Sequence, residues 1–370
     1  MADRRSTSDL AWSQAIGHSG RTMGRWAKPA ALALVLALVA TGCASDAPQD
    51  VLDPAGPYAQ KLDNLFMPVV WVAVAVFILV EGIIVFAVLK WRHREGDDDD
   101  DMPAQMHGNT KLEIGWTILP ALILGVIAVF TVPVVFDLNA KPADALEVTV
   151  TGQKYWWGYQ YDSQPEFGIT DSEGIVTANE LHIPAGQPVY LTLTSPDVIH
   201  SFWAPRLNGK RDVVPGRTHT WSLEAFEPGA YSGQCAEFCG ISHANMRLKV
   251  VAHDRAGWDE WVEQMQQEPL KPLTGPAAEG FTLFAQKGCA GCHRVGGAYE
   301  EVAPDSPAAP DLTHLFSRDC FAGCIYDLND RNEMEAWLRD PQRKAGSLMV
   351  IGELTEPEID NLYAYLETLE

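Results

Sequence analysis

Two cysteines, a histidine and a methionine recur at short intervals in the segment 235–246, here called the ligand loop. Cys235, Cys239, His243 and Met246 are four, four and three positions apart. Thiolate, imidazole and thioether groups are ligands of copper, whereas methionine is a poor ligand of zinc. A mononuclear blue-copper site uses two His, one Cys and a weak Met, so a second Cys allows the ligands to bridge two copper ions. A Cys235–Cys239 disulfide is the alternative, but it leaves the His and the Met unexplained.

The ligand loop lacks a second imidazole, and His200 is the candidate to supply it. His200 lies at the end of a predicted strand, far from the loop in sequence. A lone His is more often structural than a ligand, but loops on a rigid scaffold are where sites are commonly assembled. His182 and His219 are weaker candidates for the same role.

A second motif that can carry a redox group is the run Cys-x-x-Cys-His formed by Cys289, Cys292 and His293. This run is the attachment sequence of c-type haem. Two thioether bonds fix the porphyrin, and the adjacent His supplies the proximal iron ligand. A Met as distal ligand raises the haem potential. Met349, in a loop before a predicted final helix, is favoured over Met334, which lies inside a helical pattern.

The remaining cysteines are Cys43, alone near the start, and the close pair Cys320 and Cys324. Close pairs indicate separate sites rather than one disulfide framework. We expect a local disulfide between Cys320 and Cys324, which would fix a loop below the haem edge. A second metal site is not expected there, because no His or Met completes it.

Two long apolar stretches precede these motifs. Residues 65–89 contain one charge, Glu81, and residues 114–136 contain none. Both are long enough for transmembrane helices, about 65–90 and 114–136. The basic run 90–94, with its Trp, marks a cytoplasmic interface. The sequence therefore predicts an inward helix, a short cytoplasmic loop and an outward helix, with everything after about residue 138 outside the cytoplasm.

Two carboxylates are associated with these helices. Glu81 would be costly facing lipid and is expected to face a protein partner, which indicates a subunit of a larger membrane complex. Glu113 stands just before the second apolar stretch. It is either an ordinary interfacial carboxylate or one that takes up protons at the cytoplasmic face, and the residues leave both open.

The first 42 residues have the form of a secretory signal. Arg21, Arg25 and Lys28 precede a short apolar run that ends in small residues before Cys43. Small residues before a Cys are similar to a bacterial lipoprotein cleavage site, so Cys43 is the predicted lipidation site. Ordinary cleavage nearby and an uncleaved anchor are the alternatives.

From residue 146 the pattern changes to short alternating runs separated by turn residues, which predicts a small antiparallel sandwich or barrel. The ligand loop precedes the last strand. A short helix and a Pro-rich linker follow. The predicted strands are 146–152, 155–161, 180–183, 188–194, 219–223 and 246–251.

The formal net charge of −22 argues against nucleic acid as a partner. The segment from Glu279 to the end carries 17 acidic and 7 basic side chains. A basic soluble donor protein would be attracted to it electrostatically.

These motifs together resemble those of a known family. Residues 60–252 resemble subunit II of the cytochrome c oxidases, a family with two membrane helices and a cupredoxin domain that holds the binuclear copper centre CuA. The ligand loop and the segment 197–201 match the family's ligand segments. The resemblance implies a CuA ligand set of His200, Cys235, Glu237, Cys239, His243 and Met246.

Other roles follow from the same resemblance. Glu237 gives copper its backbone carbonyl, and its carboxylate is expected to face a magnesium site shared with subunit I. Glu113 falls in the family's pattern Glu-x-x-Trp-Thr-Ile-Leu-Pro, which implies the start of a proton path. Tyr155, Trp156 and Trp157 lie where the family has an aromatic surface that receives electrons, although plain strand packing is the alternative. Tyr155 replaces the family's usual Trp.

Residues 277–370 resemble a class I cytochrome c, with matches at 309–314 and 337–341. The implied fold is a multidomain membrane protein with a two-helix transmembrane hairpin, an all-β cupredoxin sandwich and an all-α cytochrome c domain. The expected organisation is a signal peptide (1–42), a linker (43–63), two membrane helices (64–138), the cupredoxin domain (146–252), a helix and linker (253–276) and the cytochrome domain (277–370).

The implied function is to pass electrons from a donor through a covalent haem c to CuA and on to subunit I, where oxygen is reduced to water. The expected cofactors are two copper ions, one haem c and a magnesium at the subunit I interface. The expected partners are subunits I and III, membrane lipid, and either a quinol–cytochrome c reductase or a cytochrome c donor, in a bacterial plasma membrane. A nitric oxide reductase subunit and a non-catalytic copper–haem shuttle are the alternatives.

Overall fold

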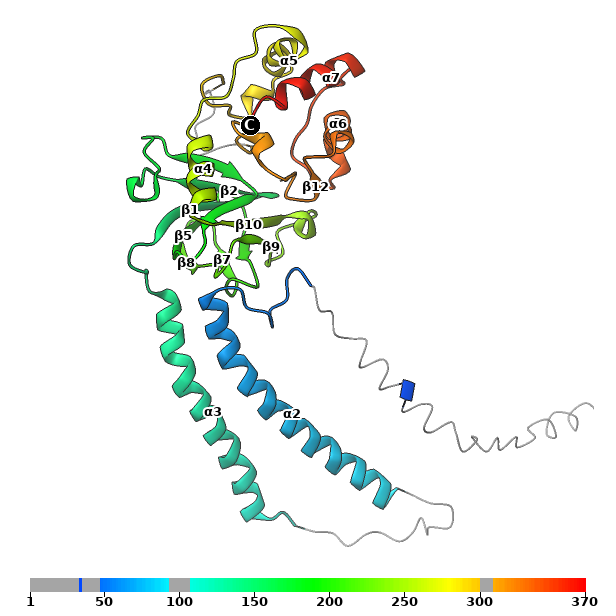
Figure 1. Ribbon diagram of the computed structural model, residues 1–370. Helices are drawn as coiled ribbons and strands as arrows, with labels where there is room; N and C mark the ends of the chain where they lie inside the picture. The colour runs from blue at the N-terminus through cyan, green and yellow to red at the C-terminus, as the bar shows by residue number, and fades with distance from the viewer. Residues whose placement is uncertain (1–32, 35–46, 93–106, 300–308) are drawn as a thin grey trace, which may run out of the picture. The chain divides into compact units, whose positions relative to one another are not determined.

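The structure is a computed structural model that describes residues 33–34, 47–92, 107–299 and 309–370 (Figure 1). The predicted signal peptide is almost entirely outside these residues, and so is Cys43. The chain divides into two units, 1–47 and 48–370, and the second contains every element discussed below.

Two long helices come first, α2 (Pro57–Trp91) and α3 (Thr110–Asn139). Both are long and apolar enough to cross a membrane. Helix α2 begins inside the predicted linker, because Pro57 occupies a first-turn position where its missing N–H costs nothing. The Ala59 amide then donates to the Leu207 carbonyl at 3.1 Å, which ties this first turn to the following domain.

A sandwich of two five-stranded sheets follows, with strand orders β3-β2-β1-β5-β8 and β4-β10-β9-β6-β7. The strands are β1 (Leu146–Gln153), β2 (Trp156–Tyr161), β3 (Ile175–Ala178), β4 (Glu180–Pro184), β5 (Val189–Thr194), β6 (His200–Trp203), β7 (Arg211–Val213), β8 (His219–Leu223), β9 (Gly229–Cys235) and β10 (Arg247–His253).

The prediction of a purely antiparallel sandwich is wrong at two pairs. Strands β1 and β5 are parallel, and so are β10 and β4. The chain leaves the first sheet after β3, adds β4 to the second sheet and returns as β5, so β5 runs in the same direction as β1. All other pairs in the two sheets are antiparallel.

Strand β1 shows why the sandwich forms. Its residues alternate between buried and more accessible positions, so one face packs into the core. The largest side chains in that core include Trp157, Tyr159 and Tyr161 from β2. Helix α4 (Arg255–Met265) adds Trp258, whose indole N–H donates to the Phe167 carbonyl at 3.0 Å.

The C-terminal domain is built on helices α5 (Gly275–Gln286), α6 (Arg331–Arg339) and α7 (Glu356–Leu366). Helices α5 and α7 pack closely at Gly280, where a Cβ atom would overlap the Asn361 carbonyl. Two short strands, β11 (Cys320–Phe321) and β12 (Tyr326–Asp327), form a hairpin between the 3-10 turn Leu315–Ser317 and α6.

Candidate functional site

The two cysteines of the ligand loop face each other as free thiols. Their Sγ atoms are 3.8 Å apart, far beyond the ~2 Å length of a disulfide, so the disulfide alternative is wrong for Cys235 and Cys239. His200 Nδ1 lies 3.9 Å from Cys235 Sγ, and His243 Nδ1 lies 3.6 Å from Cys239 Sγ. Met246 Sδ lies 3.9 Å from Cys239 Sγ. Five donor atoms from the predicted set therefore converge.

Different elements bring these donors together. Cys235 ends β9. His200 begins β6, so the prediction that it ends a strand is wrong, and β6 and β9 are neighbours in one sheet. The turn from His243 to Asn245 and the start of β10 then return Met246 to the same place. His200, Cys235, Cys239 and Met246 are buried and His243 is half-buried, so all but one of the donors lie inside the protein.

Asp197 orients His200. The His200 Nε2–H donates to the Asp197 carboxylate at 2.8 Å, which leaves Nδ1 for the cysteine side. Burial lowers the pKa of His200, but hydrogen bonds to Cys235 and Asp197 outweigh it and raise the pKa above its usual value. A hydrogen bond with Cys239 holds the pKa of the Cys235 thiol well below its usual range. A ready thiolate is what a soft metal requires.

The chemistry of this donor set fits copper. Two thiolates, two imidazoles and one thioether are available, and the Glu237 carbonyl oxygen lies 3.3 Å from Cys235 Sγ as a sixth donor. Phe238 and Ile241, on the same loop, are strongly exposed. The ligand loop therefore combines a buried donor set with an apolar surface.

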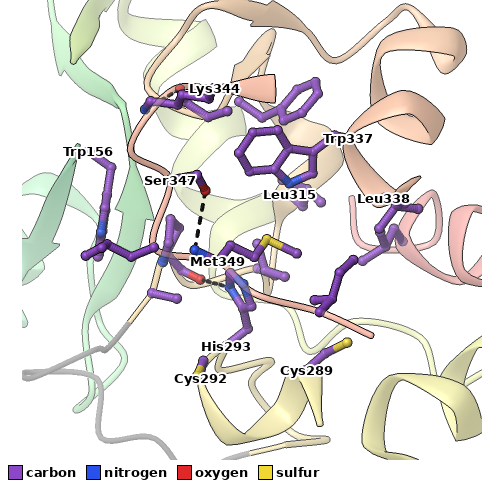
Figure 2. A pocket seen from close by; sticks show the side chains of 18 of the residues that line it. Trp156, Cys289, Cys292, His293, Leu315, Trp337, Leu338, Lys344, Ser347 and Met349 are labelled. Atoms are coloured by element: carbon purple, nitrogen blue, oxygen red, sulfur yellow. Dashed lines mark hydrogen bonds between the residues drawn. The ribbon is translucent and has the colours of Figure 1, made fainter. Parts of the chain in front are cut away.

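A second site is a cavity of about 330 Å³ that contains the Cys-x-x-Cys-His motif (Figure 2). Cys289, Cys292 and His293 line it, together with apolar residues of α6 and α7 such as Trp337 and Leu362. Both cysteines are free. An apolar pocket with two thiols and an imidazole fits a covalently attached haem.

The His293 ring is held in its neutral form. Its Nδ1–H donates to the Pro310 carbonyl at 2.8 Å, so Nε2 keeps its lone pair for a metal. Burial lowers the pKa of His293, which also favours the neutral ring. Figure 2 shows His293 and Met349 close together in the pocket.

Both candidate distal methionines line the cavity. Met334 is buried in the hydrophobic core of the domain, whereas Met349 lies on a loop and is half-buried. The Ser347 hydroxyl accepts a hydrogen bond from the Met349 amide at 3.3 Å, which supports the loop at this point (Figure 2).

The same cavity also has walls from the sandwich, where Lys154, Tyr155 and Trp156 line it. Tyr155 and Trp156, two of the three residues predicted to form an aromatic surface, are thus buried and line the haem pocket. The prediction is wrong for Trp157, which is fully buried and packs on Phe202 at a ring distance of 5.5 Å. Strand alternation sends Trp156 and Trp157, the first two residues of β2, to opposite faces, so Trp157 could not share one surface with Trp156.

The competing histidines lie elsewhere. His182 Nδ1 is 2.8 Å from His253 Nε2 and stacks on Trp261, and His219 Nδ1 bonds the Asp212 carbonyl. Neither belongs to the copper donor set.

The other predicted positions are distributed as follows. Cys320 and Cys324 are joined in a disulfide. Glu113 lies in the first turn of α3, and Glu81 lies on α2 with an exposed side chain. The sequence did not predict the roles of Asp197 and Pro310. For Asp197, its position three residues before His200 could have indicated the role.

Comparisons with known proteins bear on both sites. Three family models match: "Cytochrome C oxidase subunit II, periplasmic domain" over residues 146–253, "Cytochrome C oxidase subunit II, transmembrane domain" over 44–134 and "Cytochrome c" over 277–370. Cytochrome c oxidase subunit 2 of Alkalihalophilus pseudofirmus is 38% identical over 90% of this chain and 95% of that protein. The chain belongs to the cytochrome c oxidase subunit II family.

Cytochrome c oxidase subunit 2 of Bacillus sp. strain PS3 is 35% identical over 91% of this chain and 95% of that protein. Quinol oxidase subunit 2 of Bacillus anthracis is 33% identical over 66% of this chain and 82% of that protein. This subunit II is thus a membrane component of an oxidoreductase complex with an electron-transfer role. The family implies CuA copper, a haem in the cytochrome domain and partnership with subunit I.

Proposed function

We propose that this subunit II accepts electrons at a covalent haem c, passes them to a binuclear CuA centre and delivers them to subunit I for the reduction of oxygen to water. One observation carries the proposal. The cavity that contains Cys289, Cys292 and His293 is also lined by Tyr155, whose ring reaches the ligand loop beside Gly240. One aromatic residue therefore contacts both the haem pocket and the copper loop.

The copper ligands have distinct roles. Cys235 and Cys239 would bridge two copper ions, His200 and His243 would bind one each, and Met246 and the Glu237 carbonyl would be weak ligands. Such a pair supplies a shared odd electron with little change in geometry. The chain contributes burial of the donors and the Asp197 bond that fixes the His200 ring, and both limit rearrangement.

The haem ligands follow the same logic. Cys289 and Cys292 would attach the porphyrin, and His293 and Met349 would bind its iron. The haem supplies a one-electron carrier at a high potential when Met is the distal ligand. The Pro310 carbonyl holds the His293 proton at Nδ1, and the apolar walls exclude water.

Further roles belong to the same proposal. Glu113 would take up protons at the cytoplasmic face, and the Glu237 carboxylate would face a magnesium ion shared with subunit I. Cys43 would carry lipid. Both redox domains would lie outside a bacterial plasma membrane, in a complex that also contains subunit III, with electrons coming from a quinol–cytochrome c reductase or a cytochrome c.

Counting cofactors on the purified complex tests the assignment. We expect each subunit II to contribute two copper ions and one covalent haem, in addition to the copper and haem that subunit I contributes. Cys235→Ser should lose the binuclear copper spectrum and keep the haem, whereas Cys292→Ser should weaken haem attachment and keep the copper. Retention of both coppers in Cys235→Ser would refute the ligand set.

The alternatives give different outcomes. A nitric oxide reductase subunit would copurify with a complex that reduces nitric oxide rather than oxygen. A copper–haem shuttle would purify alone and remain stable. Two membrane helices with Glu81 and Glu113 favour a complex over a shuttle.

A further inference from the structure

We propose that Lys344 is a positioning residue that fixes the haem pocket against the ligand loop and thereby sets the rate of electron transfer between them. The inference deepens the function proposed above and rests on it. It concerns a residue that neither the sequence motifs nor the ligand set includes.

Lys344 joins three segments that are far apart in the chain. Its Nζ donates to the Tyr155 carbonyl at 2.8 Å and to the Ala322 carbonyl at 2.7 Å. Its side chain is almost fully buried and lines the haem cavity. Burial lowers the pKa of Lys344 to about 7. A buried amine with two carbonyl acceptors links the turn before strand β2, the disulfide loop and the loop that carries Met349.

Tyr155 extends this link to the ligand loop. A Cβ atom at Gly240 would lie 2.5 Å from the Tyr155 hydroxyl oxygen, and one at Gly346 would lie 3.3 Å from its ring. The ring therefore fits between a glycine next to Cys239 and a glycine two positions after Lys344. Close approach of this kind requires residues without a Cβ.

Two further bonds hold the same junction. The Ser242 hydroxyl, next to His243, donates to the Ala345 carbonyl. The Arg247 amide donates to the Gly323 carbonyl at 3.0 Å. Lys344 lies between these bonds, because a Cβ at Gly323 would come within 2.8 Å of its Nζ. Loss of the amine would leave the Tyr155 and Ala322 carbonyls without their hydrogen-bond donor. The two carbonyls could then form hydrogen bonds to water only if the segments moved apart.

The step that depends on this geometry is simple. One electron would leave the haem iron and enter the copper pair, and no bond would form or break. The rate of such a step falls steeply as the two centres move apart. A small displacement of the junction would therefore slow transfer without changing either ligand set.

The first test is the rate of electron redistribution in the purified, cofactor-loaded complex after rapid photoreduction of the haem. Lys344→Met keeps the length of the side chain and removes the donor, so we expect transfer to slow ~10-fold or more. Lys344→Gln keeps an N–H donor and should recover part of the rate. Lys271→Met, at an exposed linker position, is the matched control and should match wild type. Haem and copper spectra and potentials should be unchanged in all three variants.

The second test does not involve electron transfer. Backbone deuterium exchange of the full-length chain should increase in Lys344→Met in the peptides that contain Tyr155 and Ala322, and should stay at the wild-type level in Lys271→Met.

The outcomes separate the two proposals. Transfer at the wild-type rate in Lys344→Met, with unchanged exchange, overturns the role of Lys344 and leaves the proposed function intact. Slower transfer together with altered haem or copper potentials also overturns the role of Lys344. The residue would then act on a cofactor itself and not on the placement of the two cofactors. Absence of transfer in the wild type overturns the proposed function itself, and this inference with it.

Discussion

His200 Nε2 lies 2.8 Å from the Asp197 carboxylate, and this bond directs Nδ1 toward Cys235. Asp197 is itself fixed, because its carboxylate accepts the amides of Lys154 and Val198 at 2.8 and 2.6 Å. Burial raises the pKa of Asp197, but these hydrogen bonds outweigh it and lower the pKa. The imidazole is thus aimed by an ionised group that the backbone holds in place.

Asp197→Ala should therefore weaken copper binding while leaving the ligands themselves intact. Loss of such an orienting partner commonly costs 10–100-fold in metal affinity. Competition with a copper chelator measures the change, and Asp212→Ala, at an exposed position, is the control. Wild-type copper affinity in Asp197→Ala would show that the carboxylate does not position His200.

Gly240→Ala should disturb the contact between the ligand loop and Tyr155. Gly240 has a φ of 126°, and an added Cβ would lie 2.5 Å from the Tyr155 hydroxyl oxygen. Gly216, at a φ of 71°, also has a positive φ but open space around it, so Gly216→Ala adds backbone strain without a clash. We expect Gly216→Ala to cost ~1–2 kcal/mol and Gly240→Ala to cost ~1 kcal/mol or more beyond that.

A double substitution identifies the cause. Tyr155→Phe removes the clashing hydroxyl, so thermal unfolding of Tyr155→Phe/Gly240→Ala should recover part of the loss. If the losses in stability from Tyr155→Phe and Gly240→Ala simply add, the Tyr155 hydroxyl is not the group with which the added Cβ clashes.

The two methionines of the haem cavity should respond differently. Met349→Ala should change the haem spectrum and lower its potential, because a sulfur ligand is lost. Met334→Ala should leave the ligand spectrum intact and destabilise the domain by ~2–5 kcal/mol, since Met334 is a buried core residue. A haem spectrum changed by Met334→Ala and kept in Met349→Ala would reverse the assignment.

Acid should destabilise the sandwich through His182 and His253. Burial lowers the pKa of both, and burial together with the nearby His182 brings the pKa of His253 to about 4. As pH falls from about 6.5, the unfolded chain binds protons before the folded chain does, so stability is lost down to about pH 4. His253→Phe should reduce this loss by ~1 kcal/mol, a value kept small because the His253 ring is partly exposed and screened by water.

Melting temperatures at pH 7 and pH 4.5 measure the effect. His219→Phe, with a half-exposed ring on β8, is the control. An equal drop in melting temperature for wild type and His253→Phe would exclude the pair as the acid-sensitive group.

The sequence predicted that the candidate copper ligands lie near one another, because five of the six are in one short loop whose spacing limits their geometry. Strand β2 and helices α6 and α7 were also anticipated, since their patterns are regular. Strands β3, β6, β7 and β9 were missed. The first three have only three or four residues, too few to show a period, and β9 begins at Gly229 and is interrupted by Gly233. The bond from Lys344 to Tyr155 spans 189 positions and has no local signal, so only the folded chain reveals it.

Among the described residues, one cysteine pair is bonded and Cys235, Cys239, Cys289 and Cys292 are free. All of them would mature in the same oxidising compartment. Maturation of this subunit therefore requires two opposite redox states in one chain. Cys320 and Cys324 must be oxidised, while the other four thiols stay reduced until copper and haem bind. A premature disulfide at either reduced pair would remove the thiols that copper or haem needs, until exchange with another thiol reopened it.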